Sequence, residues 1–438
     1  MRDLASRVKR TLPFVSNLFV KAAFKIKQKA KRKRKKRIAC PRRKMEAIEE
    51  STLYAFKPFV YTYYNRASKR KPAARSGHRI VCNDNYLYLF GGYNPNIVTT
   101  VWGPISMLLR ELWRLNLSTG NWELLPVENI PKYVASSSVI LTGDVLLVYG
   151  GSGVPFGANS SNKLFVCDLS LDVLEFTEVL TVGTSPIPGY GQACFLQDGK
   201  LFVFGGTTGY TYWSDIGSLD IRTNCWETEY TCVGLENEPR GRYRHELGNL
   251  HNKTFVLGGG TSDHSFGFTE INVYSHEDKS WLAVPASCDP EQNDYPLPRR
   301  YHSSVQSDDK IFIFGGIYNK RALQDTWSLD LNTLQWTCVR SLYFPYPTFF
   351  HDSCLTPSGK VYTFGGVSTK ELVNHSIDGL ITKEQVTERS ADLYSAWICI
   401  PSLKEIAWEA VLFYRFHENE HTKALIPTPF RDRLIDKR

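Results

Sequence analysis

Six short runs of apolar residues, rich in β-branched and aromatic side chains, each end in a pair of glycines. A run such as residues 86–90 or 311–314 leads into the Gly pair, and a polar loop and a further strand-like run follow. The pairs recur at steps of 50 to 59 residues: Gly91-Gly92, Gly150-Gly151, Gly205-Gly206, Gly258-Gly259, Gly315-Gly316 and Gly365-Gly366. A repeat of this period built from short strands predicts an all-β propeller with six blades.

Most units also carry a large aromatic residue where a fourth strand is expected. Four units have tryptophan there and a fifth has phenylalanine: Trp122, Phe176, Trp226, Trp281 and Trp336. A ring of this size is expected to fill the space between neighbouring blades. The pattern resembles the kelch repeat. The WD40 repeat has a similar period but needs a Trp-Asp dipeptide, which this sequence lacks. We therefore expect a six-bladed kelch propeller over residues 59–400.

The last unit has no fourth strand of its own, because helical spacing begins soon after the strand-like run 393–400. The chain before the first repeat offers a substitute in the run 59–64. Closing the ring with this N-terminal strand would remove its open sheet edges. We expect three regions: a basic tail over 1–50, the propeller over 59–400, and a short amphipathic helical segment over 401–438.

The positive charge of the chain lies in its N-terminal tail. The formal net charge is +9, and residues 1–44 carry eighteen Lys and Arg against the single acid Asp3. The remainder is then 9 − 17 = −8, which argues against nucleic-acid binding by the propeller. The block Lys31–Arg37 is typical of a nuclear import signal, with importin as partner and a nuclear and cytoplasmic location. Contact with acidic membrane or RNA surfaces, or a solvated tail without a partner, are the alternatives.

Several classes of function find no support in the sequence. Ten cysteines are scattered without a C-x-x-C pair, so we expect free thiols and no zinc site. No apolar run is long enough for a transmembrane segment. There is no nucleophile elbow and no phosphate loop, so we expect a non-catalytic protein without a cofactor. An oxidoreductase propeller like galactose oxidase would need copper ligands that converge on one face.

Four units place a histidine thirteen or fourteen residues before the first glycine of the pair: His78, His245, His302 and His351. Ser137 and Gln192 take this place in two other units. A metal or catalytic cluster is one interpretation. Equivalent positions of a repeat lie on different blades, however, so we expect structural histidines that are hydrogen-bonded within the blades.

Arginine and tyrosine alternate around these positions in the fourth and fifth units. The residues are Arg242, Tyr243, Arg244, Arg299, Arg300 and Tyr301, and Tyr190 has the matching place in the third unit. By the logic of the repeat they share one face of the propeller. A guanidinium pairs a carboxylate in bidentate geometry, so this face is a candidate carboxylate site. The alternative is that these arginines pair locally with acids such as Glu246.

Helical spacing begins after Pro401. Ser402 and Glu405 have the spacing of a capping box. Apolar residues then follow on one helix face: Leu403, Ile406, Ala407, Ala410, Val411 and Tyr414. This face could pack on the propeller as a lid, or it could dock a partner protein.

Several segments resemble the kelch domain-containing protein 10 (slim) family. They are residues 74–79, 86–95, 110–114, 205–210, 242–246 and 258–262, and Pro401-Ser402-Leu403 with Trp408-Glu409. The resemblance covers about residues 59–414. It implies a substrate receptor of a cullin-RING ubiquitin ligase of the cullin-two type, docked through elongin B–C. It also implies capture of protein C-termini that end in glycine, on one propeller face.

The resemblance assigns roles to particular residues of this chain. Arg242, Arg244, Arg299 and Arg300 would bind the terminal carboxylate, and Tyr190, Tyr243 and Tyr301 would contact the preceding side chains. The elongin-binding box would fall on Leu403, Ala407 and Val411. Ala407 stands where the family has cysteine, a loss of about 1 kcal/mol of packing, and the cullin-selecting segment after the box is short. A kelch interaction scaffold without a ligase is the alternative function.

Overall fold

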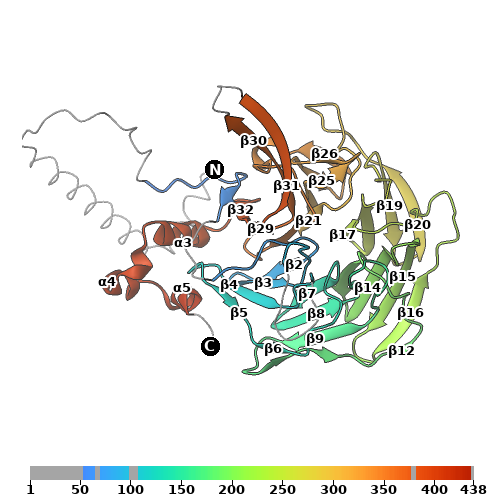
Figure 1. Cartoon of the computed structure of the whole chain (residues 1–438), viewed down its shortest axis with the longest axis horizontal. Helices are drawn as coiled ribbons and strands as arrows, with labels where there is room; N and C mark the ends of the chain where they lie inside the picture. Colours follow the sequence, from blue (N-terminus) through green and yellow to red (C-terminus); the bar gives the residue numbers. More distant parts are fainter. Residues whose placement is uncertain (1–52, 65–69, 98–106, 376–380, 436–438) are drawn as a thin grey trace, which may run out of the picture. The chain divides into compact units, whose positions relative to one another are not determined.

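The computed structural model describes residues 53–64, 70–97, 107–375 and 381–435. The basic block Lys31–Arg37 therefore lies outside the described residues. Contacts divide the chain after Leu53, and residues 54–438 are described as one unit. Its main strands form six antiparallel sheets, each built on four strands and arranged around a central axis (Figure 1). The six-bladed propeller predicted from the Gly pairs is confirmed.

The innermost strand of each blade precedes the other main strands of that blade in the chain, except that the outermost strand of blade 6, β1 (Thr62–Tyr63), precedes all the others. Blade 1 contains β2 (Arg79–Cys82), β3 (Tyr86–Phe90), β4 (Leu112–Asn116) and β5 (Trp122–Leu124). Blade 2 contains β7 (Ser138–Thr142), β8 (Val145–Tyr149), β9 (Leu164–Asp168) and β11 (Thr177–Glu178). Blade 3 contains β13 (Ala193–Gln197), β14 (Lys200–Thr207), β15 (Tyr212–Asp220) and β16 (Cys225–Tyr230), with β12 (Val182–Gly183) added in parallel.

The remaining blades follow the same order. Blade 4 contains β17 (Glu246–Leu250), β18 (Lys253–Leu257), β19 (Glu270–Ser275) and β20 (Ser280–Pro285). Blade 5 contains β21 (Ser303–Ser307), β22 (Lys310–Phe314), β25 (Thr326–Asp330) and β26 (Gln335–Cys338). Blade 6 contains β28 (Asp352–Leu355), β29 (Lys360–Phe364), β32 (Leu393–Trp397) and β1 (Thr62–Tyr63).

Smaller elements connect or extend the blades. They are β6 (Val127–Glu128) paired with β10 (Leu174–Glu175), the hairpin of β23 (Ile317–Tyr318) and β24 (Arg321–Ala322), and the helical turn η1 (Arg340–Leu342). Blade 6 carries the longest extension, in which β27 (Thr348–Phe349) pairs with the hairpin of β30 (Val367–His375) and β31 (Ile381–Arg389). This hairpin lies between the second and third strands of its blade.

Apolar clusters between adjacent blades form the core. Trp336 of blade 5 is fully buried among side chains of blade 4, such as Phe255 and Leu257. Its indole nitrogen donates to the backbone oxygen of Phe268 at 3.0 Å. The recurrent aromatic residue is therefore a plug between neighbouring blades, as predicted. In blade 2 the equivalent Phe176 interrupts the outer strand between β10 and β11.

The glycine pairs of blades 4, 5 and 6 each pack against two histidines. In blade 5, a Cβ on Gly316 would lie 2.9 Å from the Cβ of His302 in the same blade. A Cβ on Gly315 would lie 3.1 Å from the ring of His351 in the next blade. Both glycines have positive φ, 53° and 99°, which a residue with a side chain rarely adopts. Only glycine therefore fits between the two imidazoles.

The same packing recurs around the ring, with His78 against Gly365 and Gly92, and His245 against Gly205 and Gly259. All four histidines are buried. Burial lowers the pKa of each, in His245 and His351 to about 3. Their role is to separate and align the blades. Within the described part of the chain, no group of three His, Cys, Asp or Glu side chains could hold a metal ion.

The ring is closed by the N-terminal strand, as predicted. Thr62 and Tyr63 of β1 pair with Ser395 and Tyr394 of β32. The hydrogen bond from the Phe59 amide to the Trp397 oxygen, at 2.7 Å, extends this pairing beyond the two-residue strand. The first and last parts of the propeller thus share one sheet. The nine cysteines among the described residues are free, and no described helix is long and apolar enough to span a membrane.

The C-terminal segment folds into short helices: α3 (Leu403–Phe413), η2 (Phe416–Glu418), α4 (Glu420–Lys423), α5 (Thr428–Arg431) and η3 (Asp432–Leu434). They lie outside the ring of sheets, beside blades 6 and 1 (Figure 1). The predicted helix is present, but its capping box is not. The Ser402 side chain makes no cap hydrogen bond. Glu405 instead forms two hydrogen bonds with Arg433, at 2.7 and 2.8 Å, because a paired guanidinium is the stronger partner.

Candidate peptide-binding face

A ring of six residues surrounds one mouth of the central channel. Each occupies the second position before the first residue of an innermost strand, and each has a left-handed backbone with φ between 51° and 67°: Gly77, Ser136, Gly191, Arg244, Tyr301 and Phe350. Backbone hydrogen bonds of 2.8–3.2 Å join consecutive members, such as the Ser136 amide to the Gly77 oxygen. Left-handed backbone costs roughly 1–2 kcal/mol per non-glycine residue. These bonds offset that cost and hold the four side chains of the ring at the channel mouth.

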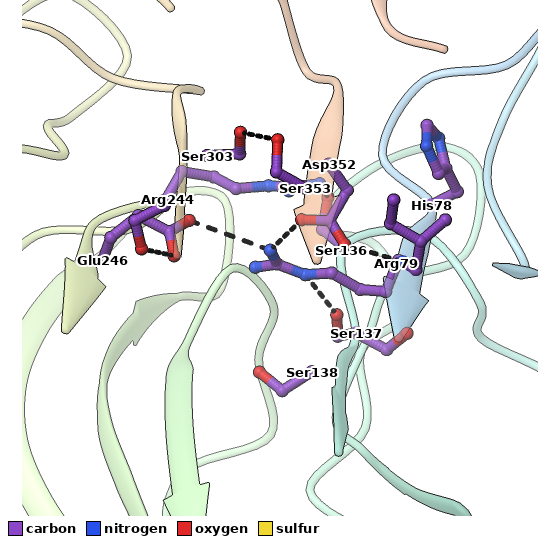
Figure 2. A network of polar contacts seen from close by, with 12 residues as sticks. His78, Arg79, Ser136, Ser137, Ser138, Arg244, Glu246, Ser303, Asp352 and Ser353 are labelled. Carbon is purple, nitrogen blue, oxygen red and sulfur yellow. Dashed lines mark hydrogen bonds and ion pairs between the residues drawn. The ribbon is translucent and has the colours of Figure 1, made fainter. Parts of the chain in front are cut away.

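A buried network of charges fills the channel behind the ring. Arg79 lies between Asp352, at 2.8 Å, and Glu246, at 3.8 Å (Figure 2). Ser304 donates a hydrogen bond to Glu246 at 3.1 Å. Burial raises the pKa of Glu246 to about 7, although the positive charge of Arg79 opposes the shift. Glu246 is therefore paired with Arg79, which is not one of the candidate arginines that the alternative interpretation of the sequence paired with it.

Two of the predicted carboxylate-binding arginines turn back into their own blades. Arg299 is fully buried, donates to the Gly315 oxygen at 2.9 Å, and pairs with both oxygens of Asp325 at 2.8 Å. Arg242 makes the equivalent bond to the Gly258 oxygen at 3.0 Å and stacks on a phenylalanine ring. Both guanidinium groups fasten the glycine pair of their blade. We therefore remove Arg242 and Arg299 from the candidate carboxylate site.

Arg300 lies at the same face but supports a loop. Its two terminal nitrogens donate to the Ser265 hydroxyl at 3.2 Å and to the Ser262 oxygen at 2.8 Å. Its guanidinium also lies 5.2 Å from the centre of the Tyr301 ring. Arg300 therefore contributes positive charge to the rim, with its best donors already engaged.

Arg244 extends from blade 4 across the channel mouth. Its Nη2 donates to the Ser136 hydroxyl of blade 2 at 2.5 Å, and its guanidinium lies 5.3 Å from the centre of the Phe350 ring of blade 6. The side chain is buried, and burial lowers its pKa to about 10. No carboxylate among the described residues lies within salt-bridge distance of it. Of the four predicted arginines, this one is placed at the centre of the face.

The three predicted tyrosines are brought together. Aromatic rings follow one another around the mouth in a row that we call the aromatic belt: Tyr93, Phe156, Tyr190, Tyr243, Tyr301 and Phe350. Successive ring centres are 3.8 to 6.3 Å apart. The hydroxyls of Tyr243 and Tyr301 are hydrogen-bonded to each other. The belt offers flat apolar walls with hydroxyl edges, which suits side chains of an extended peptide.

Sequence reasoning missed two parts of this face. Tyr93 and Phe156 lie in the loops that follow the glycine pairs of blades 1 and 2, and these loops have no fixed repeat pattern. Arg389 ends strand β31 of the hairpin extension, and its guanidinium lies 5.0 Å from the centre of the Tyr93 ring. The only signal for Arg389 was the unusual length of the polar loop after the sixth glycine pair.

The box residues lie at a different end of blade 6. Leu403 is 77% exposed, while Ala407 and Val411 are partly exposed. Helix α3 is held by its other faces: Trp408 is buried and packs on Phe430, 5.3 Å between ring centres. Of the three box residues, Leu403 is thus the one that the rest of the protein leaves most exposed.

The other face of α3 is anchored to the propeller. Glu409 accepts a hydrogen bond from the Tyr54 hydroxyl at 2.8 Å and pairs with Lys360 at the start of β29. At the far end of β29, Phe364 leads into the sixth glycine pair and the channel mouth. The helix and the aromatic belt therefore lie toward opposite ends of the blade 6 strands.

The repeated glycine pairs and the interblade aromatic plugs define a kelch-type propeller, and the aromatic belt is its candidate binding face. A model of the KLHDC2/KLHL20/DRC7 kelch-repeats domain matches residues 77–295 and 236–380. Kelch domain-containing protein 10 of Xenopus tropicalis is 38% identical over 357 residues, which cover 80% of this chain and 82% of the relative.

Further relatives have the same description. The human kelch domain-containing protein 10 is 37% identical over 78% of this chain and 74% of its own length. The Drosophila melanogaster homolog is 32% identical over 88% of this chain and 66% of its own length. The chain therefore belongs to the kelch domain-containing protein 10 family of kelch-repeat proteins, a family of protein-binding propellers.

Proposed function

We propose that this protein is the substrate-recognition receptor of an elongin BC cullin-RING ubiquitin ligase, and that it captures the C-termini of target proteins on the aromatic belt. The observation that carries the proposal is the aromatic belt with Arg244 at its centre, because Arg244 has no carboxylate partner among the described residues. Aromatic walls around a desolvated guanidinium suit a chain end, because a C-terminus combines side chains with a free carboxylate.

The position of α3 supports the ligase part of the proposal. An adaptor bound to α3 and a substrate bound on the belt would not compete, because the two sites lie toward opposite ends of the blade 6 strands. Leu403 is exposed and available as an anchor for an apolar groove, and anchors of this kind carry most of the energy of an interface. Ala407 in place of the family's cysteine would weaken the contact without removing it.

The test is co-purification of elongin C and cullin with the full-length tagged protein. Leu403→Glu places a charge in the proposed apolar contact, whereas Lys404→Glu introduces the same residue at the next exposed position, outside the box. We expect the wild type and Lys404→Glu to retain both partners and Leu403→Glu to lose both. Loss of both partners from the wild type as well would refute the ligase role, and the protein would then be a kelch interaction scaffold.

We also propose that Lys31–Arg37 directs the protein to the nucleus, so that it is found in both nucleus and cytoplasm. An uninterrupted cationic block is the chemistry that importins bind. Replacing the seven residues by serine and glycine should leave a fluorescent fusion in the cytoplasm. An unchanged nuclear fraction would contradict the assignment.

A further inference from the structure

Two arginines converge on one short segment of blade 1: Arg244 of blade 4 and Arg389 of the blade 6 extension. Arg389 donates from Nε to the Ser76 hydroxyl at 3.0 Å. The Nη2 of Arg244 lies 3.2 Å from the place that a Cβ on Gly77 would occupy. Ser76 and Gly77 are adjacent, and Gly77 belongs to the ring at the channel mouth. The absence of a side chain at Gly77 leaves room for the Arg244 guanidinium to reach this point.

Both arginines have hydrogen-bond donors that no described residue accepts from. The Arg389 side chain donates a hydrogen bond through Nε, and neither of its terminal nitrogens is hydrogen-bonded to another described residue. The buried Nε of Arg244 likewise has no partner. Arg75, Arg79 and Arg299 differ, because each pairs with a carboxylate. Neither Arg244 nor Arg389 has a salt-bridge partner among the described residues, and a guanidinium with unused donors favours binding of an anion.

Arg389 is also held in one orientation. Its backbone pairs with Val367 at the base of the β30–β31 hairpin, next to the sixth glycine pair. The Ser390 amide donates to the Gly366 oxygen at 2.9 Å, and the Ser390 oxygen accepts from the Arg75 amide at 3.2 Å. The Tyr93 ring covers the guanidinium at 5.0 Å. A donor fixed in this way loses little entropy when a ligand binds.

We propose that Arg389, together with Arg244, receives the terminal carboxylate of a bound protein chain at Ser76–Gly77. The two terminal nitrogens of Arg389 can pair a carboxylate in bidentate geometry, and Arg244 adds a second positive charge. Tyr93 stands beside this point and continues into Phe156, so the residues before the carboxylate run along the aromatic belt. This assignment rests on the proposed capture of C-termini, and it moves the carboxylate from blades 4 and 5 to the seam between blades 6 and 1.

The experiment measures retention of the purified full-length protein on a pool of random decapeptides that end in glycine. The pool is made once with a free carboxylate and once as the C-terminal amide. We expect the wild type to prefer the free acid at least tenfold. Arg389→Ala should abolish that preference. Arg389→Lys, which keeps one charge but loses the bidentate fork, should retain only part of it. Arg321→Ala is the matched control on the exposed β23–β24 hairpin and should behave as the wild type.

The outcomes separate the two levels of the proposal. If the wild type prefers the free acid and both Arg389 variants keep the full preference, the assignment of Arg389 is wrong while the capture of C-termini stands. If the wild type binds acid and amide alike, or neither, the capture of C-termini is refuted and the assignment with it. Thermal unfolding midpoints of all variants are measured in parallel, and Arg389→Lys decides the question if Arg389→Ala does not fold.

Discussion

Glu246 is a carboxylate whose ionisation is expected to oppose folding. It faces Arg79, Asp352, Arg244 and Ser304 in the central channel, and burial raises its pKa to about 7 from the ordinary 4.5. This rise in pKa corresponds to about 3 kcal/mol. Because the folded state holds the proton more tightly than the unfolded chain, stability falls as pH rises from about 4.5 to about 7.

Glu246→Gln removes this titration and keeps a hydrogen-bond acceptor for Ser304. From the two pKa values, ionisation of Glu246 costs about 1 kcal/mol at pH 5.5 and about 3 kcal/mol at pH 8.5. The stability of the variant relative to the wild type should therefore grow by about 2 kcal/mol between these pH values. The assay is urea unfolding of both proteins at each pH, followed by tryptophan fluorescence.

The difference between the two proteins isolates Glu246 from the other buried groups. The four buried histidines have lowered pKa values, so their contribution to stability is lost as pH falls below about 6.5, but it is common to both proteins. Glu236→Gln, on an exposed loop, is the control and should stay within about 0.5 kcal/mol of the wild type at both pH values. A constant difference for Glu246→Gln, or one that shrinks toward pH 8.5, would refute the reasoning and show that Arg79 fully offsets the burial.

Three further predictions concern the propeller itself. Trp336→Ala removes a fully buried plug between blades 4 and 5 and should lower the free energy of unfolding by about 3–5 kcal/mol in urea titrations. Arg299→Met removes a fully buried guanidinium, leaves the partly buried Asp325 without it, and should cost about 3–5 kcal/mol, whereas Arg321→Met, at an exposed site, should cost less than about 0.5 kcal/mol; equal costs would contradict the structural role of Arg299. A chain that begins at residue 66 lacks β1 and leaves the edge of β32 open, so size-exclusion chromatography should show self-association; a stable monomer would contradict this.

The fold could be predicted because its signals are local and repeated. The glycine pairs, the interblade aromatics and the histidines recur in register, and each repeat constrains the others. The missing fourth strand of the last unit pointed to closure by residues 59–64 for the same reason. The sequence also held a signal for Arg242 and Arg299 that was not used: each stands sixteen residues before the glycine oxygen that it binds, as does Arg75.

The site could be predicted only in part, because the repeat pattern does not determine the direction in which each side chain points. Tyr190, Tyr243 and Tyr301 lie close together as expected, since equivalent positions of the repeat share one face of the propeller. Arg389 belongs to an insertion found in blade 6 and has no counterpart elsewhere in the ring, so no pattern marked it. The capping box failed because a distant residue, Arg433, competes for Glu405, and such long-range pairing has no signature in a local window.

The strand that closes the ring also sets the order in which the protein can be completed. Thr62 and its partner Ser395 are separated by 333 residues, so the seam forms only after nearly the whole chain has left the ribosome. Until then one side of the first blade is not covered by its neighbour, and contacts of such long range are slow to form. A chain that terminates early would form an incomplete ring of folded blades. Such a ring would expose its uncovered sheet surface to chaperones and proteases.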